Sequence, residues 1–296
     1  MKKITYLLIL LIAASTAGCE KEIPFDPENA RTRIVMYSFL YPGELLQVEL
    51  TKSQNILINT NGGDYPPVEG ATIKVYKDGV FAGEMQEDLV NNNGNYYLFE
   101  TVEAGASYRF EVEHPELEGV RSFTRMPESE PTFTATLVDT SSIEWILEIE
   151  VQDDPGEDYF VLDLIWESQA GGTSPEPIWF ASTDPFLQTP ESYYDPTDPN
   201  EYFDGEAYFT DEHFADGTYR FRVKMYADWW TVQDKTHIRV RLKSLTRDYY
   251  LFRYSSLLQQ WNNGDPFAQP VLIHNNVENG MGCVGSLNPG MQRVEI

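Results

Sequence analysis

The residue types that most often carry catalysis are present in this sequence, but no catalytic motif arranges them. The chain has 296 residues and four histidines, and no two histidines have the spacing of a metal-binding pair. The G-x-S-x-G turn that exposes a nucleophilic serine is absent. Because there are 47 acidic residues, no single pair of carboxylates stands out as an acid and base. We therefore predict no catalytic residue and no cofactor, and the sequence favours a protein that is not an enzyme.

Cys19 lies where covalent modification is expected. Two lysines are followed by an apolar run and then by small residues, which is the layout of a secretory signal. The apolar run is shorter than the roughly 20 residues that cross a bilayer as a helix. A cysteine directly after Ala17-Gly18 resembles the bacterial lipobox, in which the cysteine receives lipid. We expect residues 1–18 to be a lipoprotein signal peptide, residues 19–32 a lipid-anchored linker, and Cys19 the site of lipidation. An ordinary cleaved signal is the alternative.

Aromatic residues gather in an irregular segment, residues 170–206. Its prolines and glycines prevent one regular element, and long loops of this kind are often functional. Trp and Tyr are favoured where an apolar body meets a polar rim, as at protein interfaces and in sugar clefts. The candidate ligand or partner contacts are Trp179, Phe180, Tyr193, Tyr194 and Tyr202. The alternative is that these side chains form a small core within the loop.

The same segment offers oxygen ligands for a hard cation. Calcium is bound by several carboxylate and carbonyl oxygens on a flexible loop. The candidate ligands are Asp195, Asp198 and Asp204, although their spacing does not fit the EF-hand template. A solvated acidic loop is the alternative, and no other metal site is predicted.

The elements that would position these residues are mostly strands. From residue 33 to 127, short segments with β-branched and aromatic residues at period two are separated by turn signals such as Asp78-Gly79. Six or seven strands in under about 100 residues indicate an immunoglobulin-like β-sandwich. Pro127 and Pro131 mark a boundary to the next region.

Residues 128–296 predict a second β-rich domain of different organisation. Residues 159–168 read as a strand, with one apolar face formed by alternate residues. Residues 247–262 are the one convincing amphipathic helix, and residues 271–277 and 291–296 read as further strands. Trp229 and Trp230 fall in a segment that reads as a strand, which places them on opposite faces. The fold class is therefore mainly β, with one helix near the C-terminus.

The charge of the chain limits its partners. The formal net charge is −26 at pH 7, with 47 acidic and 21 basic residues. Nucleic acids and anionic lipid surfaces require clustered Lys and Arg, so both are excluded as binding surfaces, and contact with a membrane is expected through the lipid anchor only. Cys283 is the only other cysteine.

Several segments, taken in order, resemble a lipoprotein family of Bacteroidota catalogued as a domain of unknown function. They are CEKEIPFD, VEGATIKVY, NGNYYL, GASYRFEVEHPE, TRMPE, FTDEHFADGTYRFRV and the run from SLTRDYYLFRY to NGMGCVG. The resemblance implies an outer-membrane protein, often encoded near TonB-dependent transporters, with no established reaction. It also implies that Glu20, Lys21 and Glu22 form a signal for export to the cell surface.

Three functions are consistent with these observations. The first is a non-catalytic, lipid-anchored accessory protein that associates with a TonB-dependent outer-membrane transporter and assists nutrient capture or uptake. The second is a surface lipoprotein that binds or cleaves glycans, with the loop aromatics as stacking platforms. The third is a structural or assembly subunit of an outer-membrane complex.

Overall fold

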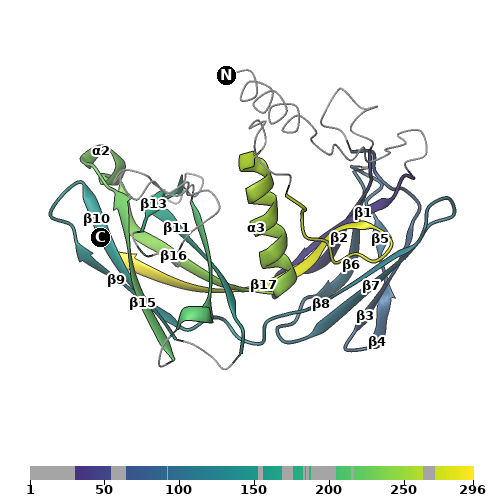
Figure 1. Ribbon diagram of the computed structural model, residues 1–296, viewed down its shortest axis with the longest axis horizontal. Helices are drawn as coiled ribbons and strands as arrows, with labels where there is room; N and C mark the ends of the chain where they lie inside the picture. The colour runs from purple at the N-terminus through teal and green to yellow at the C-terminus, as the bar shows by residue number, and fades with distance from the viewer. Residues whose placement is uncertain are drawn as a thin grey trace, which may run out of the picture. The chain divides into compact units, whose positions relative to one another are not determined.

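The computed structural model is mainly β, as the sequence predicts (Figure 1). The structure describes residues 31–54, 65–91, 93–152, 156–168, 176–182, 184, 187, 205–214, 217–262 and 271–296. Among these residues, no helix combines the length and the apolarity that crossing a bilayer requires.

The first region is a two-sheet sandwich around one hydrophobic core. Its strands are β1 (Ile34–Leu40), β2 (Leu45–Lys52), β5 (Gln86–Glu87) and β6 (Asn95–Thr101) in one sheet, and β3 (Thr72–Lys77), β4 (Val80–Glu84), β7 (Ser107–Glu113) and β8 (Val120–Arg125) in the other. Buried and exposed side chains alternate along β1, β2 and β7, and Tyr96, Tyr108 and Phe110 are fully buried between the sheets. Asp78 and Gly79 both have positive φ, so they form the tight hairpin turn that the sequence predicts between β3 and β4.

The second region is also built from two facing sheets. One sheet contains β9 (Phe133–Asp139), β10 (Glu144–Gln152), β13 (Phe180–Ala181) and β15 (Thr218–Tyr226). The strands that face it are β11 (Tyr159–Ser168), β12 (Glu176–Pro177), β14 (Glu206–Thr210), β16 (Lys235–Leu245) and β17 (Met281–Glu295). The helical elements are η3 (Asp211–His213), α2 (Trp229–Val232) and α3 (Arg247–Asn262). As predicted, Phe160, Leu162, Leu164 and Trp166 of β11 share one face, which lies in this second core.

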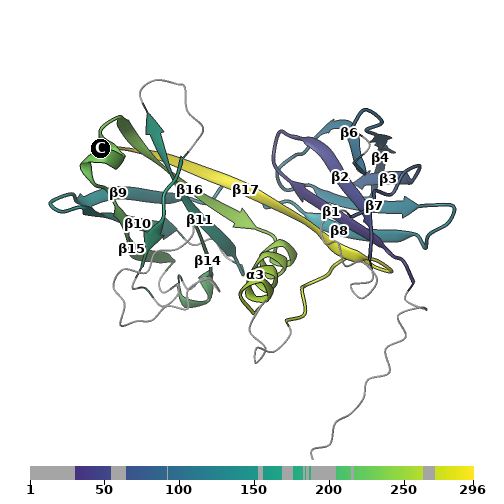
Figure 2. The ribbon, with the colours of Figure 1, turned by 90° about the horizontal axis from the view of Figure 1, so that it is seen from above.

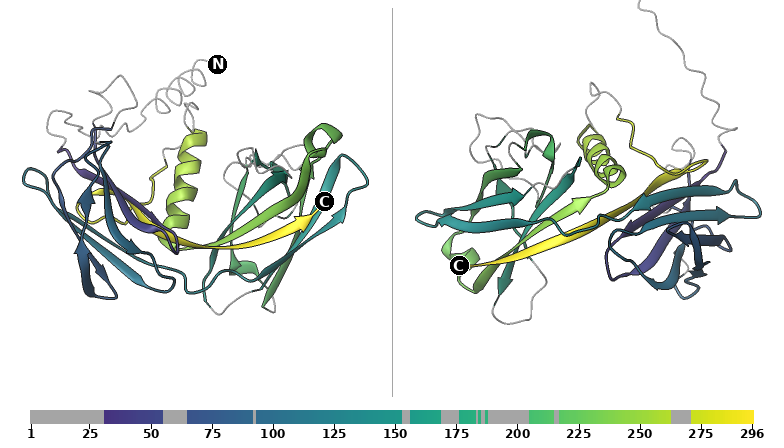
Figure 3. Two further views of the ribbon diagram at one scale, coloured as in Figure 1. Left: turned by 180° about the vertical axis from the view of Figure 1, so that it is seen from behind. Right: turned by 90° about the horizontal axis from the view of Figure 1, so that it is seen from below.

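Strand β17 is part of both regions (Figure 2). Its first half pairs in parallel with β1, from Met281 opposite Val35 to Ser286 opposite Leu40, and its second half pairs antiparallel with β16. Val284 accordingly lies in the first core and Val294 in the second. Figure 3 shows this long strand from two further sides. The C-terminal residues therefore complete a sandwich whose other strands lie near the start of the chain.

Helix α3 packs on the outer face of β17. The approach is so close that a Cβ atom on Gly285 would lie 2.5 Å from Cβ of Tyr249, so only glycine fits there. The helix has the bounds that the sequence predicts, but the side chains from 248 to 258 are all half-buried. Tyr250 packs on Tyr159 of the second region, whereas Phe252 lies 5.7 Å from Tyr37 of the first, measured between ring centroids. Contacts with both regions explain why no single face of the helix is buried.

The strand predicted at residues 271–277 is not formed. The side-chain amide of Asn276 donates to the Val284 carbonyl oxygen at 2.7 Å and accepts from the Val284 backbone N–H at 2.9 Å. Asn275 similarly bonds to the backbone of Val277. Two asparagine side chains thus form hydrogen bonds with backbone groups that would otherwise pair with a neighbouring strand. Such hydrogen bonds between side chain and backbone compete with the formation of regular secondary structure.

Candidate functional site

Four exposed aromatic side chains lie at one end of the second sandwich, and we call them the aromatic edge: Trp179, Tyr226, Trp229 and Trp230. Their exposed fractions range from 46% for Tyr226 to 76% for Trp230. By contrast, Trp166 is buried in the second core and Trp145 packs against it. Exposed aromatic groups that cluster are unusual on a soluble surface and are typical of binding sites.

Strand pairing explains why two of these side chains are neighbours. Phe180 pairs with Met225, and both face the core. Trp179 directly precedes β13 and Tyr226 directly follows Met225 at the end of β15, so the two exposed side chains flank the buried Phe180–Met225 pair. Tyr226 also pairs with Glu144 of β10, which bounds the aromatic edge with a carboxylate on that side.

The other two aromatics are presented by the short helix α2. The carboxylate of Asp228 accepts hydrogen bonds from the backbone N–H of Thr231 at 2.9 Å and from its hydroxyl at 2.7 Å. These bonds cap the helix and lower the pKa of Asp228. None of the four residues of α2 is buried, so both Trp229 and Trp230 face solvent. The expectation that they lie on opposite faces of a strand is therefore wrong, because the chain turns into a helix directly after β15.

Charged side chains cover the outer face of the neighbouring strands β15 and β10. Three cross-strand ion pairs join β15 to β10: Arg220 with Glu150, Arg222 with Glu148 at 2.8 Å, and Lys224 with Glu144 at 3.3 Å. The aromatic edge is thus the apolar end of a solvated, charge-paired sheet. It offers ring faces and a polar rim, which suits binding by contact and stacking.

The structure places only some of the predicted contact residues. Trp179 is exposed, as a contact residue must be, whereas Phe180 is fully buried in the second core and is not available to a ligand. Phe180 begins β13 and packs in the second core, whereas Trp179 lies in the segment between β12 and β13 and is exposed. Outside the described residues lie Tyr193, Tyr194 and Tyr202, the calcium candidates Asp195, Asp198 and Asp204, and the N-terminal residues Cys19, Glu20, Lys21 and Glu22. Tyr226 was not predicted, although its position shortly before two adjacent tryptophans was a usable signal.

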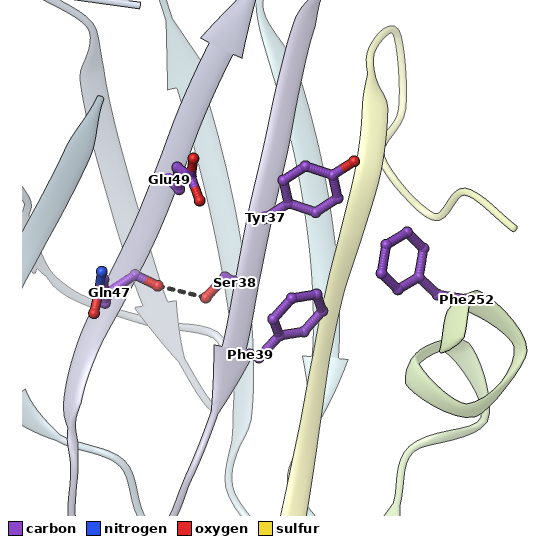
Figure 4. A pocket seen from close by; sticks show the side chains of 6 residues that line it. All are labelled: Tyr37, Ser38, Phe39, Gln47, Glu49 and Phe252. Carbon is purple, nitrogen blue, oxygen red and sulfur yellow. Dashed lines mark hydrogen bonds between the residues drawn. The ribbon is translucent and has the colours of Figure 1, made fainter. Parts of the chain in front are cut away.

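A second surface feature is a groove of about 340 Å³ on the outer face of the first sandwich (Figure 4). It is lined by Tyr37, Ser38, Phe39, Gln47, Glu49 and Phe252. Figure 4 shows the rings of Tyr37 and Phe39 projecting from β1 toward Phe252 of α3, with Gln47 and Glu49 on the neighbouring strand β2. The sequence did not predict this groove, because it requires β1 to lie beside a helix that is more than 200 residues away in the chain.

Near the N-terminal half of α3, a histidine, an aspartate and a cysteine lie close together, but their environment does not favour a catalytic site. The Nε2 atom of His274 lies 2.7 Å from Oδ1 of Asp248, and the nearby Cys283 is fully buried. Burial, and secondarily the Asp248 carboxylate, raise the pKa of Cys283 to about 12, so the thiol stays protonated and unreactive. A packing role for Cys283 fits this environment. No group of three or more His, Cys, Asp or Glu side chains in the described part of the chain is placed to hold a metal ion.

Comparison with known proteins identifies the family. Residues 20–293 match the family model described as Domain of unknown function (DUF4249). The chain belongs to this family. No curated protein matches its sequence.

Solved structures give only distant likenesses. A β-glucuronidase from Parabacteroides merdae is 10% identical with a TM-score of 0.23, and the match covers 73% of this chain and 24% of the enzyme. A protein named as membrane anchored from Corynebacterium diphtheriae is 7% identical with a TM-score of 0.21, over 72% of this chain and 54% of its own. Bovine butyrophilin is 11% identical with a TM-score of 0.21, over 72% and 92% respectively. This DUF4249 chain thus spans about a quarter of the glucuronidase, and similarities at this level carry no functional argument.

Proposed function

We propose that this DUF4249 protein is a non-catalytic accessory protein, anchored in the outer membrane through lipid on Cys19 and exposed on the cell surface. In this proposal it associates with a TonB-dependent transporter and assists the capture or uptake of a nutrient. The aromatic edge is the proposed contact with that transporter.

The observation that carries the proposal is the exposure of Trp179, Tyr226, Trp229 and Trp230 at one end of a sheet whose strands β10 and β15 carry ion pairs on their outer face. Keeping large aromatic side chains in water forgoes about 1.5–3 kcal/mol of burial each, which binding to a partner would recover. Trp and Tyr are also the residues that most often dominate the energy of protein interfaces. The family resemblance noted from the sequence supplies the type of partner, and the cysteine motif supplies the anchor.

Co-purification from native membranes tests the association. The protein is tagged at its C-terminus, extracted in a gentle detergent, and its partners are identified by mass spectrometry. We expect a β-barrel transporter to be recovered with the wild type and to be lost from the W229A/W230A double variant. The matched control is Phe99→Ala, which removes an aromatic side chain that is 76% exposed on β6 of the first sandwich.

The two tryptophans are not buried, so their replacement should change the free energy of unfolding by no more than about 0.5 kcal/mol, as is usual for surface substitutions. The thermal midpoint of the double variant should therefore be close to that of the wild type. Recovery of the same transporter with the double variant would show that the aromatic edge is not the contact. Absence of any barrel protein from the wild-type sample would contradict the association itself.

The anchor is tested separately. A Cys19→Ala variant should appear in the soluble fraction, whereas replacement of Glu20, Lys21 and Glu22 should leave the protein membrane-bound but protected from protease added to intact cells. A cysteine variant that stays in the membrane would contradict both the anchor and the export signal.

One observation also favours a glycan-binding role. Trp179 and Tyr226 are both exposed and flank the Phe180–Met225 pair of β13 and β15, and exposed aromatic rings are suitable for stacking against sugar rings. On a carbohydrate array, retention that is lost on Trp179→Ala or on the W179A/Y193A/Y194A triple change would support this function. An array on which the wild type binds nothing would remove its main support.

A further inference from the structure

We propose that the groove formed by β1, β2 and α3 binds the cationic head of an arginine or lysine side chain of a partner protein. This inference rests on the proposed function only in requiring a protein partner, and it concerns a surface separate from the aromatic edge. Nothing in the family description assigns a site to it.

Three aromatic rings form one wall of the groove. Tyr37 and Phe39 alternate on the outer face of β1, and Phe252 from α3 lies 5.7 Å and 5.8 Å from them, measured between ring centroids. Tyr249 backs Phe39 at 4.7 Å and fixes its ring. Packing from two elements therefore holds the rings in place before any ligand arrives.

A carboxylate faces these rings. Glu49 pairs directly with Tyr37 across the antiparallel β1–β2 ladder, which puts the two side chains on the same face as near neighbours. Glu49 is exposed and forms no ion pair with any residue that the structure describes. None of the six lining residues that the structure describes is basic, so among them the negative charge of Glu49 stands beside aromatic walls without a compensating cation.

This combination selects for an organic cation. Ring faces attract a cation placed within about 6 Å of the ring centroid, and a carboxylate adds direct charge attraction and accepts its hydrogen bonds. Gln47 supplies an amide at the same rim, although its Nε2 atom already donates to Asn95 at 3.2 Å. The alkyl stem of Arg or Lys can lie along the rings while its charged head reaches Glu49.

The shape of the groove favours a side chain of a partner over a free small molecule. Pockets for free ligands enclose most of the ligand surface. Here the floor is the outer face of two strands, and the rim residues Gln47 and Glu49 are exposed. A partner would close the open side with its own surface. The formal charge of −26 would also attract a basic surface from a distance.

Two capped tripeptides test the charge requirement, Gly-Arg-Gly and its isostere with citrulline, which is neutral. Saturation-transfer NMR on the full chain in detergent micelles detects such weak binding through the signals of the peptide. We expect the arginine peptide to bind at least about tenfold more tightly than the citrulline peptide, because the cation–π and ionic contacts are both lost in the latter.

Variants locate the binding to the groove. Glu49→Gln keeps the shape and removes the charge, and we expect it to weaken binding of the arginine peptide up to about fivefold, as for one partly exposed ion pair. Phe252→Leu removes one ring face and should also weaken binding. The matched control is Glu84→Gln, which removes the same charge from an exposed position on β4 in the other sheet and should leave the affinity unchanged.

Three outcomes would overturn the inference. They are equal binding of the two peptides, wild-type affinity in the E49Q variant, and an equal loss in the E84Q variant, which would indicate attraction by net charge alone. Tighter binding of free butylguanidinium than of the arginine peptide would overturn the choice of a partner protein. None of these results affects the co-purification test, because that test changes only the aromatic edge.

Discussion

The two sandwiches bury their sheets differently. In the first, β1 and β2 bury one face and leave the other half-buried or exposed, as alternating strands do. In the second, eight consecutive residues of β11 are buried, because the facing sheet covers one side and α3 and its neighbours cover the other. The first region is thus two layers, except where α3 reaches Tyr37 and Phe39 of β1, and the second is partly three. Helix α3, as the additional layer, covers polar side chains on this face of the sheet, and these side chains must find partners there.

That surface contains an ion network that has no counterpart among the ion pairs described in the first sandwich. Asp163 is 4% exposed, and Nζ of Lys243 lies 2.7 Å from its Oδ2 atom. Arg253 of α3 bonds to Glu206 at 3.1 Å and to the hydroxyl of Tyr208 at 2.9 Å. In the first sandwich, the Lys74–Glu113 pair is more exposed, with side-chain exposures of 35% and 68%. Charges therefore connect the helix to the second sheet, whereas in the first region they lie on the surface.

The largest expected effect tests whether the two cores unfold together. Phe110→Ala and Phe180→Ala each remove a fully buried ring, one from each core, and should each cost about 3–5 kcal/mol in urea unfolding. All six tryptophans lie between residues 145 and 261, so none of them belongs to strands β1 to β8 of the first sandwich. Because β17 pairs with strands of both regions, we expect F110A also to lower the fluorescence midpoint. An unchanged midpoint would show that the regions unfold independently.

The next effect compares buried with exposed charge. Lys243→Met leaves the buried carboxylate of Asp163 with Arg241 as its remaining ion-pair partner, and should lower the free energy of unfolding by about 3 kcal/mol. Lys74→Met in the first sandwich breaks an exposed pair and should cost less than about 1 kcal/mol. Both are measured by urea denaturation at pH 7. Similar losses in the two variants would contradict the distinction.

A smaller effect tests how closely α3 packs. Gly285→Ala places a methyl group 2.5 Å from Cβ of Tyr249 and should cost about 1–3 kcal/mol, because the helix must move away from β17. Gly83→Ala in the first sandwich meets only the flexible end of Leu98, at 2.9 Å. That control should stay within about 1 kcal/mol of wild type. A neutral G285A variant would mean that α3 is free to shift.

The smallest effect is a dependence on pH. Burial alone would raise the pKa of Glu206, but the hydrogen bond from Tyr208 and the charges of Lys243 and Arg253 hold it below its ordinary value. The ionised carboxylate therefore stabilises the folded state above the ordinary pKa, and this contribution is lost as the pH falls through the lower, folded-state pKa. We expect the stability difference between wild type and Glu206→Gln to be largest near pH 7 and to shrink below about pH 4.5.

The matched control for this pH series is Glu113→Gln, which changes the exposed pair of the first sandwich. Its difference from wild type should stay small at every pH, because exposed pairs contribute little. Urea midpoints between pH 7 and pH 3 give both curves. If the difference in stability between wild type and Glu206→Gln instead grew as the pH fell, the lowered pKa of Glu206 could not be its cause.

Much of the fold could be predicted from local patterns. Period two predicted the alternating strands of the first region, such as β1 and β2, the Asp78-Gly79 pair predicted a hairpin turn, and the helical spacing predicted α3. These features depend on neighbours in the chain. The prediction failed at residues 271–277, where asparagine side chains bond to the backbone, and at Trp229 and Trp230, where Asp228 starts a helix.

The candidate site was predictable only in part. Aromatic composition indicated Trp179, but its exposure and the burial of Phe180 depend on how the chain passes from β12 to β13 and packs against the second core. The groove could not be predicted, because Glu49, Tyr37 and Phe252 come together only through pairing between strands and packing of a distant helix.

The sequence by itself determined the class of fold, the strands with alternating burial, the helix and the family, because these follow from local periodicity and from the order of short segments. Only the tertiary structure decided that β17 belongs to both sandwiches, that α3 adds a third layer, and which aromatic side chains face solvent. The physical reason is that pairing of residues distant in the chain sets the register, and the register decides which face of each strand is buried.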